Sequence, residues 1–153
     1  MSFNQLKANE ADPTGMQEVT NPLLQSAPTI FVVEEDNNAR PALTKNLRQF
    51  GYRLLVAADV EDALEWVSSS SYIHADLVLI DLVGKSPEEA LRAGQRLRLQ
   101  AKYPGETPLV VMPEKVDQDV EGTNENVIAN DWICYYEDAD QLQRLLIRLL
   151  SRA

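Results

Sequence analysis

Five short apolar runs, separated by stretches of helical periodicity, constrain the fold of this chain more than any other feature. A continuous apolar run of four or five residues is typical of a strand covered on both faces. The runs are residues 29–33, 53–57, 77–80, 109–112 and 132–135. Their alternation with helices predicts a three-layer, flavodoxin-like α/β fold, in which helices cover both faces of a five-stranded parallel sheet.

Local signals place several of the helices between these runs. Ser86 can cap a helix whose first position is Pro87, and Glu89 can reach back to the cap, which makes this the clearest helix start. Gly51 predicts the end of the helix before residues 53–57. The stretch 114–126 has no apolar stripe, so we expect only a short or irregular helix there, around residues 125–129.

The chain of 153 residues is long enough for one domain. Residues 1–28 have neither helical nor strand periodicity, and we expect a flexible N-terminal arm followed by a domain over residues 29–153. The excess of 24 acidic over 14 basic side chains gives a net charge of −10, which argues against nucleic acid and anionic membranes as partners. A single cysteine, the lack of a signal peptide and the shortness of the apolar runs predict a cytoplasmic protein without a membrane span.

Acidic residues follow two of the predicted strands at the edge where ligands bind in such sheets. Glu34 and Glu35 come directly after the first run, and Asp81 follows the third. If these strands are neighbours, the carboxylates converge, and they either raise one another's pKa or recruit a hard cation such as Mg²⁺.

Two segments resemble the receiver domain of bacterial two-component response regulators. Residues 32–36, with their acidic pair, are similar to the end of that family's first strand, and residues 76–82 are similar to the segment that carries its phospho-accepting aspartate. The resemblance implies that Asp81 accepts phosphate, that Glu34 and Glu35 hold Mg²⁺ together with Asp81, and that Val83 offers the metal a backbone carbonyl. It also implies the receiver-like strand order 2-1-3-4-5.

The chain departs from the family pattern at the site. Pro113 stands where the family has a Ser or Thr hydroxyl, and Tyr135 stands where it has a Lys, so two groups that would bond a phosphoryl group are missing. Glu34 and Glu35 each bring an extra methylene to the metal site, which puts Mg²⁺ affinity in doubt. Trp132 occupies the position of the family's rotating aromatic residue. We therefore treat Pro113, Trp132 and Tyr135 as the switch positions.

These features predict a stand-alone, atypical receiver that signals through protein contacts with weak or no phosphorylation-driven switching. Two alternatives stay open: a single-domain receiver that accepts phosphate on Asp81 from a histidine kinase, and a small metal-dependent phosphate hydrolase. We expect no enzyme, because no catalytic triad, dinucleotide fingerprint or phosphate-binding loop is present. The expected partner is a sensor histidine kinase or a downstream target protein.

The last predicted helix offers a partner surface. Beyond the leucines that suffice for its core stripe, Ile147 and Leu150 are apolar, and Arg144, Arg148 and Arg152 form a basic row beside them. Such a row on an acidic protein suggests a homodimer, or a complex with an acidic partner, through this face. The alternative is a solvated helix face with extended arginines.

Overall fold

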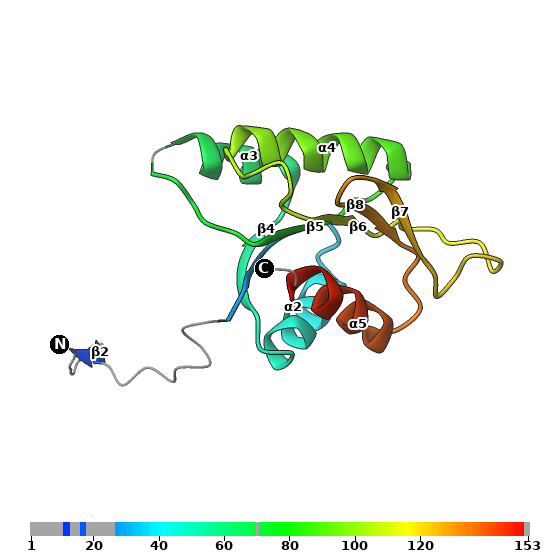
Figure 1. The fold of residues 1–153 in the computed structure, drawn as a ribbon, viewed down its shortest axis with the longest axis horizontal. Helices are drawn as coiled ribbons and strands as arrows, with labels where there is room; N and C mark the ends of the chain where they lie inside the picture. Colours follow the sequence, from blue (N-terminus) through cyan, green and yellow to red (C-terminus); the bar gives the residue numbers. More distant parts are fainter. Residues whose placement is uncertain (1–10, 13–15, 18–26, 70, 152–153) are drawn as a thin grey trace.

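A computed structural model describes residues 11–12, 16–17, 27–69 and 71–151, and its main feature is one six-stranded sheet (Figure 1). Five strands are parallel and lie in the order β4-β3-β5-β6-β8, while β7 is added antiparallel at the outer edge of β8. The strands are β3 (Thr29–Glu34), β4 (Arg53–Ala57), β5 (Leu77–Asp81), β6 (Leu109–Val111), β7 (Asn124–Ile128) and β8 (Asp131–Cys134). The predicted α/β class and parallel core are confirmed, but the prediction of only five strands is wrong.

Helices cover both faces of the sheet, as Figure 1 shows. One face carries α2 (Arg40–Gln49) and α5 (Ala139–Leu150), and the other carries α3 (Val60–Ser69) and α4 (Pro87–Gln100). Alternate strand residues point to opposite faces, so β3 places Phe31 in the core beneath α3 and α4, and Val32 in the core beneath α2 and α5. The continuous apolar runs are therefore explained by burial on both sides.

The predicted helix signals act as expected. Ser86 accepts a hydrogen bond from the Glu89 backbone N–H at 3.1 Å, and the Glu89 carboxylate accepts one from the Ser86 N–H at 2.9 Å, which closes the capping box of α4. Gly51 follows α2 with a φ of 99°, a conformation that glycine adopts without the steric cost of a side chain.

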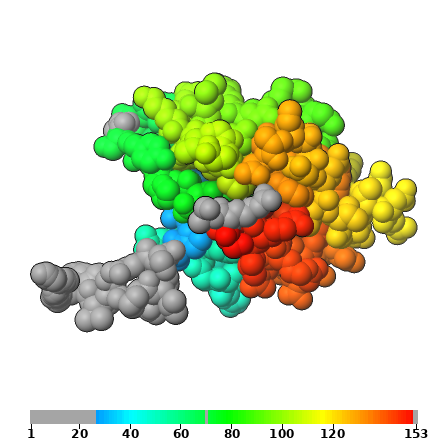
Figure 2. Space-filling view, in the orientation of Figure 1, coloured from blue at the N-terminus to red at the C-terminus, as the bar shows by residue number. Residues whose placement is uncertain are grey.

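The region expected to form an irregular helix around residues 125–129 instead forms strand β7, which corrects that prediction. Asn, Val and Ile are poor helix formers, and β-branched residues suit a strand. A two-residue turn, in which Ala129 has a φ of 48°, joins β7 to β8. The segment that leads from β6 to β7 projects from the body at the right of Figure 2.

A buried ion pair ties α4 to the strand that β7 flanks. Asp131 at the start of β8 is buried, and its carboxylate accepts hydrogen bonds from Arg98 at 2.6 Å and from Gln95 at 2.9 Å. Arg98 also donates to the backbone carbonyl of Thr107, before β6. Because both charges are paired and hydrogen-bonded, the network fixes the position of β8 against α4.

The predicted N-terminal arm lies mostly outside the described residues. Within it, β1 (Ala11–Asp12) and β2 (Met16–Gln17) form a separate two-stranded antiparallel sheet. No helix among the described residues is long and apolar enough to span a bilayer.

Candidate functional site

Two acidic side chains meet at the carboxyl end of the parallel strands. Glu34 and Asp81 are the last residues of β3 and β5, and they are partners in the register of these neighbouring strands. Glu34 is almost completely buried, with 1% of its surface exposed, whereas Asp81 is partly exposed. The predicted convergence of these two carboxyls is therefore present in the structure.

The two carboxyls are coupled through a hydrogen bond and repel each other when both are charged. Burial is the main reason that the pKa of Glu34 rises to about 8, and the hydrogen bond with Asp81 and its charge raise this pKa further. Burial also raises the pKa of Asp81, and the charges of Asp36, Glu114 and Glu35 add to this effect. The hydrogen bond from Glu34 acts in the opposite direction and lowers it. With a pKa of about 8, Glu34 is mostly protonated at neutral pH, and in this form it can donate a hydrogen bond to Asp81.

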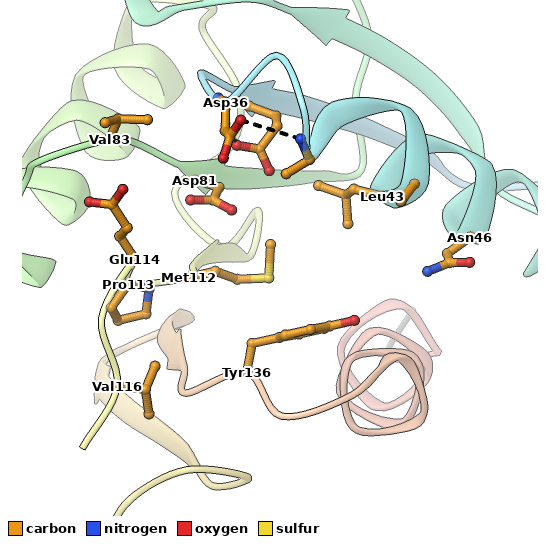
Figure 3. A pocket seen from close by; sticks show the side chains of 13 residues that line it. Asp36, Leu43, Asn46, Asp81, Val83, Met112, Pro113, Glu114, Val116 and Tyr136 are labelled. Atoms are coloured by element: carbon orange, nitrogen blue, oxygen red, sulfur yellow. Dashed lines mark hydrogen bonds between the residues drawn. The ribbon is translucent and has the colours of Figure 1, made fainter. Parts of the chain in front are cut away.

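Both side chains line a cavity of about 370 Å³ between the sheet edge and α2 (Figure 3). Its walls combine carboxylates with apolar side chains, and a tyrosine ring closes one side. The carboxyl-bearing residues in the wall are Glu34, Asp36, Asp81 and Glu114. The described residues that line the cavity include no lysine, arginine or histidine. A cavity with this lining attracts cations and opposes the entry of phosphate.

Glu35 is not part of this cavity, although it directly follows Glu34. Its carboxylate accepts a hydrogen bond from the backbone N–H of Val83 at 2.8 Å. It lines a second cavity of about 520 Å³ between α3 and α4, where Lys85 and Arg92 also lie. Successive side chains at the end of a strand point to opposite sides, and Asp36 takes the place in the first cavity that was expected for Glu35.

The arrangement of these residues does not fit Mg²⁺. Mg²⁺ needs several oxygen ligands in near-octahedral geometry, and carboxylates bind it in their ionised form. In the part of the chain that the structure describes, no three Asp, Glu, His or Cys side chains are grouped so as to hold a metal ion. Moreover, Glu34 carries a proton, and Glu35 is bonded to the Val83 N–H on the other side of the strand end.

The switch positions are separated in space. Pro113 follows β6 and lines the first cavity, where it offers no hydrogen-bond donor. Tyr135 lies elsewhere: its hydroxyl donates to the Glu125 carboxylate of β7 at 2.8 Å. Burial, together with this bond and the charge of Glu125, raises the pKa of Tyr135 to about 12.

Tyr136 is one of the cavity residues that the sequence reasoning missed, as are Asp36 and Glu114. The Tyr136 ring closes the side of the cavity opposite the strand ends (Figure 3). The alternation of side chains along β8 is the sequence signal that could have placed Tyr136 in the cavity. Trp132, Cys134 and Tyr136 lie on one side of the sheet, and Tyr135 faces the other.

Trp132 belongs to the α5 side of the molecule. Its ring packs partly against the core beneath α2 and α5, and the guanidinium of Arg148 lies 4.8 Å from the ring centroid, in cation–π range. The predicted surface on α5 is only partly free. Ile147 is 52% exposed, whereas Leu150 packs against the core. Arg144 is exposed, and Arg152 lies outside the described residues.

Known structures with the same fold are receiver domains. The receiver domain of a sensor histidine kinase from Pseudomonas aeruginosa, crystallised with magnesium in its active-site cleft, is 21% identical, with a TM-score of 0.56 over 82% of this chain and 99% of its own. A response regulator from Thermotoga maritima is 22% identical, with a TM-score of 0.57 over 82% of this chain and 98% of its own.

A response regulator receiver protein from Sinorhizobium medicae is 16% identical, with a TM-score of 0.62 over 84% of this chain and 98% of its own. No protein-family model matches the sequence, and a comparison with curated proteins gave no match. The resemblance found in the sequence is thus confirmed at the level of the fold: the chain has the fold of a response-regulator receiver domain.

Proposed function

We propose that this chain acts in signal transduction through protein contacts, as an atypical receiver whose output does not depend on phosphorylation of Asp81. One observation carries the proposal: the cavity around Asp81 is lined by four carboxyl-bearing residues and by no basic side chain among the described residues. A phosphoryl group adds up to two negative charges. In this cavity it would meet carboxylates where a receiver needs cations.

The loss of the two hydrogen-bond partners of a phosphoryl group can be expressed as a free energy. Hydrogen bonds to charged groups contribute roughly 1.5–3 kcal/mol each. Pro113 cannot donate such a bond, and Tyr136 brings a hydroxyl without a positive charge. Two losses of this size remove most of the energy that would hold a phosphorylated Asp81 in a switched conformation. We therefore expect weak phosphorylation or none.

We further propose that Mg²⁺, which one structurally similar receiver domain holds in its cleft, binds weakly to this chain. Binding would require the release of the proton that Glu34 and Asp81 share, and the loss of the hydrogen bond between Glu35 and the Val83 N–H. Both changes oppose affinity, because metal ligands must be deprotonated and free to turn towards the ion.

The second candidate function is a phosphorylatable receiver that accepts phosphate on Asp81 from a histidine kinase. It is favoured by one observation, the position of Asp81 at the end of β5, partly exposed and on the cavity wall. The misfit of the carboxylates to a metal ion gives no such support to a metal-dependent phosphate hydrolase, and we propose no enzymatic activity for the chain.

The proposed contact surface includes α5. Ile147 and the two exposed arginines, Arg144 and Arg148, form an apolar and basic surface on an acidic protein. This combination fits an acidic partner or a second copy of the chain, in which the arginines supply orientation more than affinity.

Phosphorylation can be tested by incubating the protein with Mg²⁺ and acetyl phosphate and reading the intact mass over time. We expect little or no added phosphate on the wild type. The double variant Pro113→Thr with Tyr136→Lys restores a hydroxyl and a positive charge to the cavity, and we expect it to be labelled faster. Rapid stoichiometric labelling of the wild type that is lost in Asp81→Asn would overturn the proposal and favour the second candidate.

A further inference from the structure

The outer edge of β7 is unpaired. This strand is the last of the six-stranded sheet, and its only neighbour in the described part of the chain is β8. A strand at the edge of a sheet presents a row of backbone N–H and C=O groups that can accept a further strand. Figure 1 shows β7 at the end of the sheet, beyond β8.

The side chains of β7 are exposed on both faces of the sheet. Only Asn124 is partly buried, and Val127 and Ile128 are exposed by 44% and 63%. Both are apolar and β-branched, so they suit contact with an added strand. A bulge at Val127 interrupts the regular pairing with β8. Because bulges disturb the edge geometry, the straight part of the edge is confined to residues 124–126.

Despite its exposure, β7 is held firmly at its start by the buried side chain of Gln141 on α5. The amide nitrogen of Gln141 donates to the carbonyl of Thr123 at 3.1 Å and to the side-chain oxygen of Asn124 at 3.0 Å. The amide oxygen accepts from the backbone N–H of Glu137 at 2.7 Å. The strand is therefore preorganised, which lowers the entropic cost of adding a partner to it.

The surroundings of this edge are strongly acidic. Glu125 lies on the strand itself, and Glu121 precedes it; both are exposed. Glu137 lies against Gly122, where a Cβ would come within 2.6 Å of its carboxylate oxygen. Asp117 and Asp119 are exposed in the projecting segment before the strand. A strand added at this edge would therefore lie close to several negatively charged side chains.

We propose that the β7 edge, over residues 124–126, binds an extended basic segment of a partner protein as an additional strand of the sheet. Backbone hydrogen bonds would supply affinity, and the acidic side chains would select lysine or arginine in the partner. A second copy of this chain is a poorer occupant, since it would bring its own Glu125 and Glu121 to the same edge. This inference rests on the proposed function only in expecting a protein partner, and it does not involve Asp81.

The test uses a short synthetic peptide of alternating lysine and valine, titrated into the full chain and followed by calorimetry and by amide hydrogen exchange. We expect binding that weakens with salt, and slower exchange of amides within residues 124–126. A second peptide has the same sequence but carries N-methyl groups on alternate residues, which prevents strand pairing without changing charge. We expect it to bind about tenfold more weakly or worse.

Single substitutions distinguish an effect of charge on peptide binding from an effect on folding. Glu125→Lys and, independently, Glu121→Lys should each weaken binding of the first peptide several-fold. Tyr135→Phe removes the hydrogen bond to Glu125 without changing charge, and Glu65→Lys reverses an exposed charge on α3; both should bind as the wild type does. Asp81→Asn should also bind normally, so a failure here is distinguishable from a failure of the proposed function.

Three results would overturn the inference. The first is no binding of the lysine–valine peptide at low salt. The second is equal binding of the N-methylated peptide, which would indicate charge attraction without an added strand. The third is sedimentation showing self-association that is abolished by Glu125→Lys, since this would make a second copy the occupant of the edge.

Discussion

Replacing Glu34 by Gln should stabilise the fold in the absence of metal, and the gain should grow with pH. Gln has the shape of a protonated Glu. Its amide can donate to Asp81, and its carbonyl can accept the hydrogen bond that the Asp36 N–H now gives to Glu34 at 3.1 Å. The substitution therefore keeps the hydrogen bonds of the protonated state and removes the charge that a buried carboxylate must carry at high pH.

The magnitude follows from the pKa of Glu34, which is raised from 4.5 to about 8 in the folded protein. A raised carboxyl pKa means that the folded state holds its proton longer than the unfolded state does. The resulting loss of stability is absent below the unfolded value, grows as pH rises, and is complete above the folded value. At about 1.4 kcal/mol for each unit of pKa, the wild type should lose roughly 1 kcal/mol by pH 5 and roughly 3 kcal/mol by pH 7.

The assay is urea unfolding in EDTA at several pH values between these limits, comparing wild type, Glu34→Gln and Glu65→Gln. Glu65 is exposed on α3, so its substitution controls for the loss of one negative charge at the surface. We expect the Glu34→Gln gain in unfolding free energy to rise by about 2 kcal/mol between pH 5 and pH 7. A gain that does not change with pH, or a variant less stable than wild type throughout, would refute the reasoning.

Three further predictions concern buried residues in the strands and helices around the site. Asp131→Ala removes the carboxylate partner of the partly buried Arg98, which keeps its hydrogen bond to the Thr107 carbonyl, and should cost about 3 kcal/mol in urea unfolding. Gln141→Ala removes the side-chain hydrogen bonds to Thr123 and Asn124 at the start of β7 and takes the acceptor from the Glu137 N–H; we expect a loss of roughly 1–3 kcal/mol, with faster amide exchange in β7 than in β3. Burial raises the pKa of the Cys134 thiol to about 12, so it should resist alkylation in the native state and react once urea unfolds the chain.

The parallel core could be predicted from the sequence because its signals are local and strong. Residues 53–57 form an uninterrupted run of strand length, and strand β4 begins and ends at the same residues. The capping box at Ser86 likewise depends on residues three positions apart. Such features need no knowledge of distant contacts.

Strand β7 could not be predicted in the same way. Its sequence has no alternation of apolar and polar residues, because neither face of the strand is covered. What holds it lies outside the stretch 114–129: the backbone of β8, which follows after a two-residue turn, and Gln141 on the next helix. A pattern search within residues 114–129 contains neither of these partners.

At the site, the sequence predicted which strands bring carboxyls together but not which side chains share a cavity. Glu34 and Asp81 meet because their strands are neighbours in register. Asp36 takes the place that was expected for Glu35, since the direction of a side chain just beyond a strand depends on how the loop leaves the sheet. Here the bond from the Val83 N–H fixes Glu35 on the other side.

Strand β7, which forms where a short helix was expected, provides a close contact for one of the predicted switch residues. The Tyr135 hydroxyl bonds Glu125, and the Trp132 ring lies beneath Arg148, so two of the three predicted switch residues already have close contacts outside the cavity. Moving either residue would break an interaction without forming one to a phosphoryl group. This arrangement agrees with an output that is independent of phosphorylation.

The most direct test of that independence is an NMR titration of the ¹⁵N-labelled protein with Mg²⁺ and beryllofluoride, a mimic of the phosphoryl group. The account predicts that chemical-shift changes, where they occur at all, stay within the residues that line the cavity around Asp81. Changes that spread to the indole of Trp132 and along α5 would show that the site and the contact surface are coupled, and would contradict it.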